Sequence, residues 1–186
     1  MQVRKLLVIG TALASFIAAN AFAQDKAAKQ AEVRAKATQT LEDFYKADPK
    51  LKSAVAKAPG YAVFTTYGLS FLIGGAGGKG IAYDNKTKKT TYMDLAQASA
   101  GLQIGASDTR YLFVFTDEKS LAEFIEKGWD ASAGAAAGAG TGKDAATAGA
   151  GVGAFTGGSM YTLTKAGLQF GAAVAGTKAW KDKELN

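Results

Sequence analysis

The spacing of apolar residues divides the chain into a helical first part and a strand-rich second part. Over residues 24–48, apolar side chains recur every three or four positions on a polar background, which is typical of an amphipathic helix. These positions are Val33, Ala37, Leu41, Phe44 and Tyr45. Asp48 and Pro49 suit the start of a second, shorter helix, since Asp accepts hydrogen bonds at an N-cap and Pro fits the first turn. Pro59 and Gly60 are expected to end it.

After residue 60 the pattern changes to short aromatic and β-branched runs separated by turn residues, which is typical of strands. Such runs are 61–67, which Gly68 interrupts, 69–75, 78–83, 90–95, 101–105, 110–116, 159–164 and 168–174. The run 110–116, RYLFVFT, is apolar at consecutive positions and is predicted to be a central strand covered on both faces. Asp117 is expected to cap one inserted helix that stops at Gly128.

The order of these elements is helices first, then many strands, and it lacks the alternation of a parallel β-α-β sheet. The sequence therefore predicts an α+β fold: N-terminal helices followed by a multi-stranded, strongly curved antiparallel sheet or barrel-like β structure with one inserted helix. Residues 131–155 are rich in Gly and Ala, and we favour a hairpin there over a flexible linker. Trp180 is expected to be a last apolar anchor before a charged tail.

The run 71–84, FLIGGAGGKGIAYD, contains a literal G-x-G-x-x-G match. A dinucleotide fingerprint requires a strand, a tight turn and then a helix. Residues 81–85 instead continue as a strand and a turn, and Lys79 is followed by Gly80 rather than by the Ser or Thr of a P-loop. We therefore expect no bound nucleotide. The glycines are expected to bend the sheet or allow a close backbone approach, or to open a slot for a long apolar ligand.

The first 23 residues have the layout of a secretory signal peptide: a basic start, an apolar run at 6–19 and the small-x-small triplet Ala21-Phe22-Ala23. The alternative is a membrane anchor, but the apolar run is shorter than the roughly 20 residues that a spanning helix needs. Cleavage after Ala23 would remove Arg4 and Lys5 and lower the net charge from +6 to +4. Export to a bacterial periplasm is the predicted localisation.

The chain contains no Cys and no His, which removes several classes of chemistry. Disulfides, thiol nucleophiles, Cys/His zinc sites and Ser-His-Asp triads are excluded. Asp84, Asp94, Asp108 and Asp130 lie near predicted turns or strand ends and form no calcium-loop motif, so turn chemistry is their default interpretation. We predict no enzyme activity, no cofactor and no metal. The modest charge, without a basic stripe interleaved with aromatics, also argues against nucleic acid as a partner.

Several motifs in series resemble the SYLF domain family. They are PGYAVF at 59–64, the glycine run with GKG at 78–80, QASAGLQIG at 97–105, the aromatic strand, Gly128-Trp129, the Ala/Gly stretch and YTLTKAGL at 161–168. The resemblance covers roughly 51–180 and implies a SYLF-like domain at 49–186 that binds lipid; bacterial members are usually exported envelope proteins. Some eukaryotic members bundle actin, which we do not expect as a partner of an exported chain. Ala166 before Gly167, and Ala106-Ser107, depart from the family pattern.

The candidate lipid-binding residues are Lys79, Lys86, Lys88, Lys89, Gln97, Ser99 and Gln103. Lys86, Lys88 and Lys89 fall on one predicted hairpin tip, where cations are attracted to an anionic leaflet; a solvated sheet edge is the alternative. The three polar residues 97, 99 and 103 recur in the family motif. They could donate hydrogen bonds to a head group or satisfy buried backbone, and both interpretations stay open.

The leading hypothesis is a non-enzymatic periplasmic phospholipid-binding protein of the SYLF type, whose partner is an anionic phospholipid or membrane surface. The first helix, which is basic and amphipathic, could lie at a membrane interface or pack on the sheet. The alternative is a structural or assembly protein of the cell envelope that acts by self-association through strand edges. A third possibility, a hydrolase using carboxylates, requires two Asp or Glu side chains that face each other in a cleft.

Overall fold

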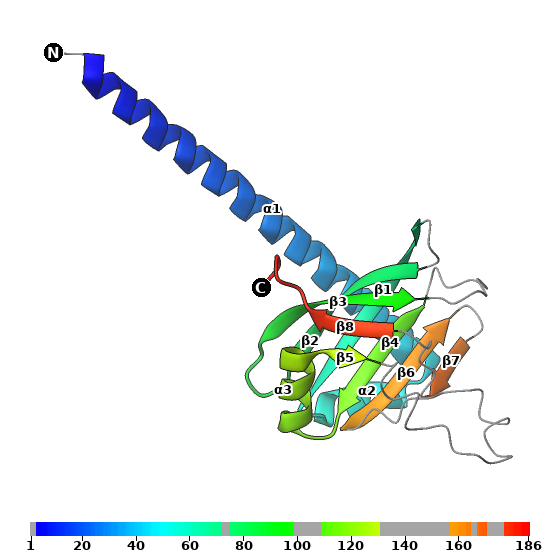
Figure 1. The fold of residues 1–186 in the computed structure, drawn as a ribbon. Coiled ribbons are helices and arrows are strands. Elements are labelled where there is room, and N and C mark those ends of the chain that lie inside the picture. Colours follow the sequence, from blue (N-terminus) through cyan, green and yellow to red (C-terminus); the bar gives the residue numbers. More distant parts are fainter. Residues whose placement is uncertain (1–2, 72–74, 99–108, 131–156, 165–166, 171–176) are drawn as a thin grey trace, which may run out of the picture.

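The computed structural model describes residues 3–71, 75–98, 109–130, 157–164, 167–170 and 177–186. These residues form three helices and eight strands (Figure 1). The helices are α1 (Val3–Ala47), α2 (Lys50–Lys57) and α3 (Glu118–Lys127). The strands are β1 (Gly60–Phe71), β2 (Gly75–Asp84), β3 (Thr90–Ala98), β4 (Arg110–Phe115), β5 (Trp129–Asp130), β6 (Gly158–Thr164), β7 (Gly167–Phe170) and β8 (Thr177–Lys181).

The strands make one antiparallel sheet in the order β5-β8-β3-β2-β1-β4-β6-β7, curled into a half-barrel. The predicted α+β class with N-terminal helices and a strongly curved antiparallel sheet is therefore confirmed. β1 and β2 occupy the middle of the sheet and separate β3 from β4. Residues 110–115 are almost entirely buried, as expected for a central strand.

α1 and α2 cover one face of the sheet. Because the apolar stripe of α1 repeats at helical spacing, its buried side chains reach the strands in one line. The buried residues of this layer are Val33, Ala37, Leu41, Phe44, Leu51, Val55, Val63, Ile81, Tyr92, Leu112, Val114, Leu163 and Leu185. The N-terminal part of α1 projects away from the sheet (Figure 1). Among the described residues, no helix has both the length and the apolarity needed to cross a membrane.

α3 covers the opposite face with an aromatic cluster. The ring of Phe124 lies 5.1 Å from Phe113 and 5.2 Å from Phe115, measured between centroids, and Trp129 lies 5.0 Å from Phe113. Asp117 caps α3, since its Oδ1 accepts the backbone N–H of Ser120 at 2.8 Å. The helix ends as predicted at a glycine, residue 128, whose φ of 75° suits a residue without a Cβ.

The glycine run lies inside strand β2, and the strand interpretation is confirmed. On the face toward α3, Gly80 sits opposite Phe64, and a Cβ there would overlap both that ring and the carbonyl oxygen of Val63. A Cβ on Gly78 would come within 2.6 Å of the carbonyl oxygen of Thr65. Small side chains in β2 therefore let β1 and its aromatic residue approach closely, as glycines in sheets commonly do.

Two sequence expectations need correction. Gly68 does not end the first strand, because β1 runs from Gly60 to Phe71, but the register of β1 with β2 shifts between Tyr67 and Phe71. Trp180 is not an anchor: it lies in β8, a strand the pattern did not predict, and is 42% exposed. Leu185, within the charged tail, is buried. The predicted strand 101–105 and the hairpin at 131–155 lie outside the described residues.

Candidate functional site

The tip of the β2–β3 hairpin is a tight turn built on Asp84. Its Oδ1 accepts the backbone N–H groups of Lys86 at 2.8 Å and Thr87 at 2.9 Å. The backbone hydrogen bond from Thr87 is the main reason that the pKa of Asp84 is lowered, so the turn carboxylate stays ionised. Lys88 adopts a φ of 60°, a conformation that favours Gly or Asn. The side chains of Lys86, Lys88 and Lys89 are exposed at this tip, as predicted.

Asn85 ties the hairpin tip to the end of α2. Its side-chain Nδ2 donates to the carbonyl oxygens of Val55 and Ala58, both at 2.8 Å. Its backbone N–H donates to the carbonyl oxygen of Pro59 at 2.9 Å. These bonds satisfy carbonyl groups at and just beyond the C-terminal end of α2 that have no partner within the helix. They also place the turn directly beside the last turn of α2.

This contact joins two sets of cations into one surface. α2 buries Leu51 and Val55 against the sheet and exposes its lysines. We call the combined set the lysine surface: Lys50, Lys52, Lys57, Lys86, Lys88 and Lys89. Within segments 50–58 and 84–89, Asp84 is the one acidic residue. Glu118 of α3 adds a second carboxylate, which pairs with Lys86 at 2.8 Å. Both side chains of that pair are more than half exposed, so it holds the lysine weakly.

The three lysines of α2 were missing from the residues predicted for the site. Their spacing, K-x-K followed five residues later by K, is visible in the sequence and places them away from the apolar stripe of the helix. What the sequence does not reveal is the neighbour, because Asn85 contacts carbonyl groups 27 and 30 residues earlier in the chain.

Lys79 lies elsewhere, in the middle of β2 on the face toward α1. Its ammonium group donates to Asp94 Oδ1 at 2.7 Å and to Asp182 Oδ2 at 2.5 Å. Burial by itself would lower the pKa of Lys79, but the hydrogen bonds to the two carboxylates outweigh it and raise the pKa. The structure therefore separates Lys79 from the hairpin tip and gives it two internal partners.

Asp182 organises the last five residues of the chain. Its side chain is only 2% exposed, and its Oδ1 accepts the backbone N–H groups of Glu184 at 2.8 Å and Leu185 at 3.0 Å. Burial would raise the pKa of Asp182, yet the bonds from Lys79 and these backbone groups lower it. The Asn186 side chain donates to the carbonyl oxygen of Tyr92 at 2.8 Å and accepts its N–H at 3.0 Å. We call residues 182–186 the tail clasp.

The tail clasp also holds α1. Gln30 Nε2 donates to the carbonyl oxygen of Leu185 at 2.7 Å, and Lys26 Nζ donates to the main-chain oxygen of Asn186 at 2.8 Å. Leu185 joins the buried layer beneath the helix. Residues from the middle of α1 and from the C-terminal end thus meet over β2 and β3.

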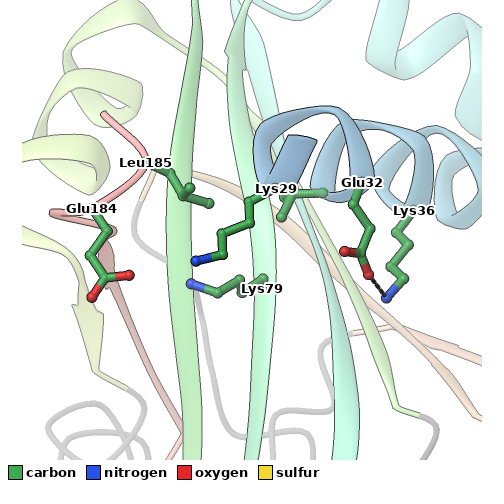
Figure 2. Close-up of a pocket in the computed structure, with 7 residues that line it drawn as sticks. Lys29, Glu32, Lys36, Lys79, Glu184 and Leu185 are labelled. Atoms are coloured by element: carbon green, nitrogen blue, oxygen red, sulfur yellow. Dashed lines mark hydrogen bonds and ion pairs between the residues drawn. The ribbon is translucent and has the colours of Figure 1, made fainter. Parts of the chain in front are cut away.

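A groove of about 370 Å³ lies between α1, β2 and the tail clasp (Figure 2). It is lined by Lys29, Glu32, Val33, Lys36, Lys79, Glu184 and Leu185. Each lysine of the lining already has a carboxylate partner: Lys29 pairs with Asp25 at 2.8 Å, Lys36 with Glu32 at 2.6 Å, and Lys79 with two aspartates. The groove is therefore close to charge balance and offers an anion little net attraction.

The remaining predicted site residues are not placed beside these groups. Gln97 lies in β3, opposite Ala76 of β2, and its side chain is outside the described part of the structure. Ser99 and Gln103 lie outside the described residues. In the part of the chain that is described, no three Asp or Glu side chains are arranged to hold a metal ion.

Comparison with known proteins gives a family match over part of the chain. Residues 96–186 match the family model Ysc84, described as Las17-binding protein actin regulator. The chain is also 31% identical over 172 residues to Beta cell expansion factor A of Aeromonas veronii, a match that covers 89% of this chain and 63% of that relative. The chain thus spans less than two thirds of the relative's length. Together with the ordered motifs from PGYAVF to YTLTKAGL, these matches identify residues 96–186 as a SYLF (Ysc84) domain.

Proposed function

We propose that this protein is a non-enzymatic phospholipid-binding protein of the SYLF type, exported to the periplasm, that attaches to anionic membranes through its lysine surface. The observation that carries the proposal is the contact of Asn85 with the end of α2. It brings lysines from a helix and from a hairpin onto one exposed surface, with few carboxylates nearby. The signal-peptide pattern of the first 23 residues supports export.

The expected strength follows from the number of charges. Each lysine near an anionic leaflet gains about 1 kcal/mol. After allowance for Asp48, Asp84 and Glu118, the six lysines amount to a net charge of about three, hence an electrostatic attraction of about 3 kcal/mol, which corresponds to a dissociation constant of about 6 mM. Binding should therefore be reversible and should weaken as salt shortens the Debye length from about 10 Å at 0.1 M.

The turn geometry offers further support. Lys88 occupies a left-handed backbone conformation in which a non-glycine residue costs roughly 1–2 kcal/mol. A turn built only for stability would have Gly or Asn at that position. A lysine kept there at that cost is consistent with a role for its charge.

The surroundings of the carboxylates support the proposal that the protein is not an enzyme. Asp94 and Asp182 share Lys79, and the pKa of Asp182 is lowered, whereas a general acid at neutral pH needs a raised pKa. Actin, which the family description mentions, is not proposed as a partner because an exported protein would not meet it. Self-association through strand edges is the alternative, and β7 at the end of the sheet is the edge it would use.

Co-sedimentation with phosphatidylglycerol and phosphatidylcholine vesicles tests the proposal. Replacing Lys57 and Lys88 by Gln removes one charge from each element of the lysine surface. The matched control replaces Lys119 and Lys127 of α3, which are exposed on the opposite side of the sheet. The first variant should bind anionic vesicles about tenfold to thirtyfold more weakly, and the control should bind with near wild-type affinity. Equal losses in both, or a wild-type protein that pellets with neither lipid, would contradict the proposal.

A further inference from the structure

We propose that the outward face of β8 is a second membrane contact, in which the indole of Trp180 enters the interfacial region of an anionic lipid surface. This inference rests on the proposed function and adds a specific aromatic contact to it.

The alternation of β8 gives the first observation. Thr177 and Ala179 are buried on the face toward α3, so Lys178 and Trp180 point to the other face of the sheet. Trp180 is 42% exposed, and it is the one exposed large hydrophobic side chain among the described residues. It sits opposite Asp94 in a ladder with β3 that extends from Met93 to Gln97. A lipid contact there would need little ordering of the backbone.

The charges around Trp180 identify the partner. Lys178 shares the face of Trp180, and Lys181 and Lys183 are exposed in the residues that follow, with Lys181 on the other side of the strand. The nearby carboxylates Asp94 and Asp182 are held on Lys79, and Asp130 pairs with Lys178 at 2.8 Å. Lysines with long apolar stems beside an amphipathic indole suit a membrane–water interface, where Trp is enriched and cations meet anionic head groups.

The position of β8 makes this contact continuous with the lysine surface. The backbone N–H of Asp182 donates to the carbonyl oxygen of Tyr92 at 3.0 Å, and Tyr92 lies two residues into β3, just after the hairpin tip. The turn of the tail clasp and the hairpin tip therefore share one end of the sheet (Figure 1). β8 is also next to the sheet margin, since only the two residues of β5 lie beyond it. A membrane that meets this corner of the sheet would reach the exposed lysines and Trp180.

Intrinsic fluorescence tests the contact directly, because the chain has two tryptophans. The other, Trp129, is partly buried against Phe113. In a Trp129→Phe variant, the emission should shift to shorter wavelength on addition of phosphatidylglycerol vesicles. Lipids brominated on the upper acyl chain should quench it, whereas phosphatidylcholine vesicles should change it little. Trp180→Ala should weaken binding to anionic vesicles about fivefold to tenfold in co-sedimentation, and Trp129→Phe should not. Far-UV circular dichroism should show both variants folded, because Trp180 is exposed and Phe at position 129 keeps an aromatic ring beside Phe113.

The outcomes separate this inference from the proposed function. Vesicle binding by the wild type without any change in Trp180 emission, or with unaltered affinity in Trp180→Ala, overturns the inference and leaves the lysine surface standing. A wild-type protein that binds no vesicle overturns both. A blue shift that depends on protein concentration without lipid, accompanied by a higher mass in light scattering, would assign the face to a second copy of the chain and overturn the lipid contact.

Discussion

Removal of the Asp182 side chain should detach the tail clasp and destabilise the whole sheet–helix assembly. In Asp182→Ala, the N–H groups of Glu184 and Leu185 lose their acceptor, and Lys79 loses one of its two carboxylate partners. Breaking a buried ion pair by removing one partner costs about 3–5 kcal/mol. Exposure of the Leu185 side chain would account for about 2 kcal/mol of this loss. We expect the free energy of unfolding to fall by about 3–5 kcal/mol.

Asp182→Asn removes the charge of this side chain but keeps its shape. The amide keeps the volume and one acceptor oxygen for the two backbone N–H groups, but it loses the charge-assisted hydrogen bond from Lys79. Such bonds contribute about 1.5–3 kcal/mol, so this variant should lose less stability than Asp182→Ala. Because Gln30 and Lys26 bond to the clasp, hydrogen exchange in α1 around residues 26–33 should accelerate in the Ala variant and much less in the Asn variant.

The lowered pKa of Asp182 also predicts a pH dependence. The unfolded chain binds the proton more tightly than the folded protein, so the contribution of this group is complete above its unfolded pKa of about 3.9. That contribution is lost as the pH falls through the lower folded pKa. Wild-type stability should therefore decline more steeply below pH 4 than the stability of Asp182→Asn.

Urea unfolding between pH 3 and pH 7, followed by circular dichroism, measures these differences. Glu42 provides the control, since it is exposed on α1, and Glu42→Ala should change stability by no more than about 0.5 kcal/mol. If Asp182→Ala is no less stable than Glu42→Ala, or if Asp182→Asn follows the wild-type pH curve, the tail clasp does not hold the fold as described.

Four further expectations follow from the sheet and its turn. Gly80→Ala should lower the free energy of unfolding by about 2–4 kcal/mol in urea, because its Cβ would meet the backbone of β1. Gly77→Ala, whose Cβ would have nothing within 4 Å, should be neutral or slightly stabilising. Equal effects of the two substitutions would contradict the close approach of β1 and β2. Asn85→Ala should lose about 1–2 kcal/mol and loosen α2 in hydrogen exchange, and unchanged protection would show that the turn does not hold the helix. Lys88→Gly should raise stability by about 1 kcal/mol while it weakens binding to anionic vesicles, an opposition that a purely structural turn would not show. Burial, aided by two neighbouring tyrosines, raises the pKa of Tyr61 to about 12, and burial also raises the pKa of Tyr45. Absorbance titration should therefore find late-titrating tyrosines and stability should fall above pH 10; titration of all tyrosines together near pH 10 would refute this.

The sequence predicted those helices and strands whose determinants lie within a few residues of one another. The three- and four-residue spacing from Val33 to Phe44 identified the buried stripe of α1, and Asp117 identified the start of α3, because a cap acts on the next three residues. Consecutive apolar residues at 110–116 identified the covered strand β4. Gly68 was predicted to interrupt the first strand, but β1 continues to Phe71 across a register shift against β2, as glycines in strands often accompany bulges.

The candidate site was predicted only in part, because its arrangement depends on contacts between distant segments. The lysines of the hairpin tip were adjacent in the sequence, so their clustering followed from one turn. Their union with the lysines of α2 depends on the side chain of Asn85, and the burial of Asp182 depends on Lys79, which is 103 residues earlier. From the sequence alone, a charged tail is expected to be solvated, because its hydrogen-bond and ion-pair partners lie in distant segments.

The order of strands in the sheet limits which part of the chain can exist as an independent unit. The family model begins at residue 96, within β3, yet β3 and β4 are joined only through β2 and β1, both of which precede that residue. A fragment starting at residue 96 would lack β1 and β2. The edges of β3 and β4 that face these strands would then have no hydrogen-bond partners, and both hydrophobic layers would lose their central residues. Truncated versions of this protein should therefore aggregate rather than fold, and studies of its family module need the residues from α1 onward.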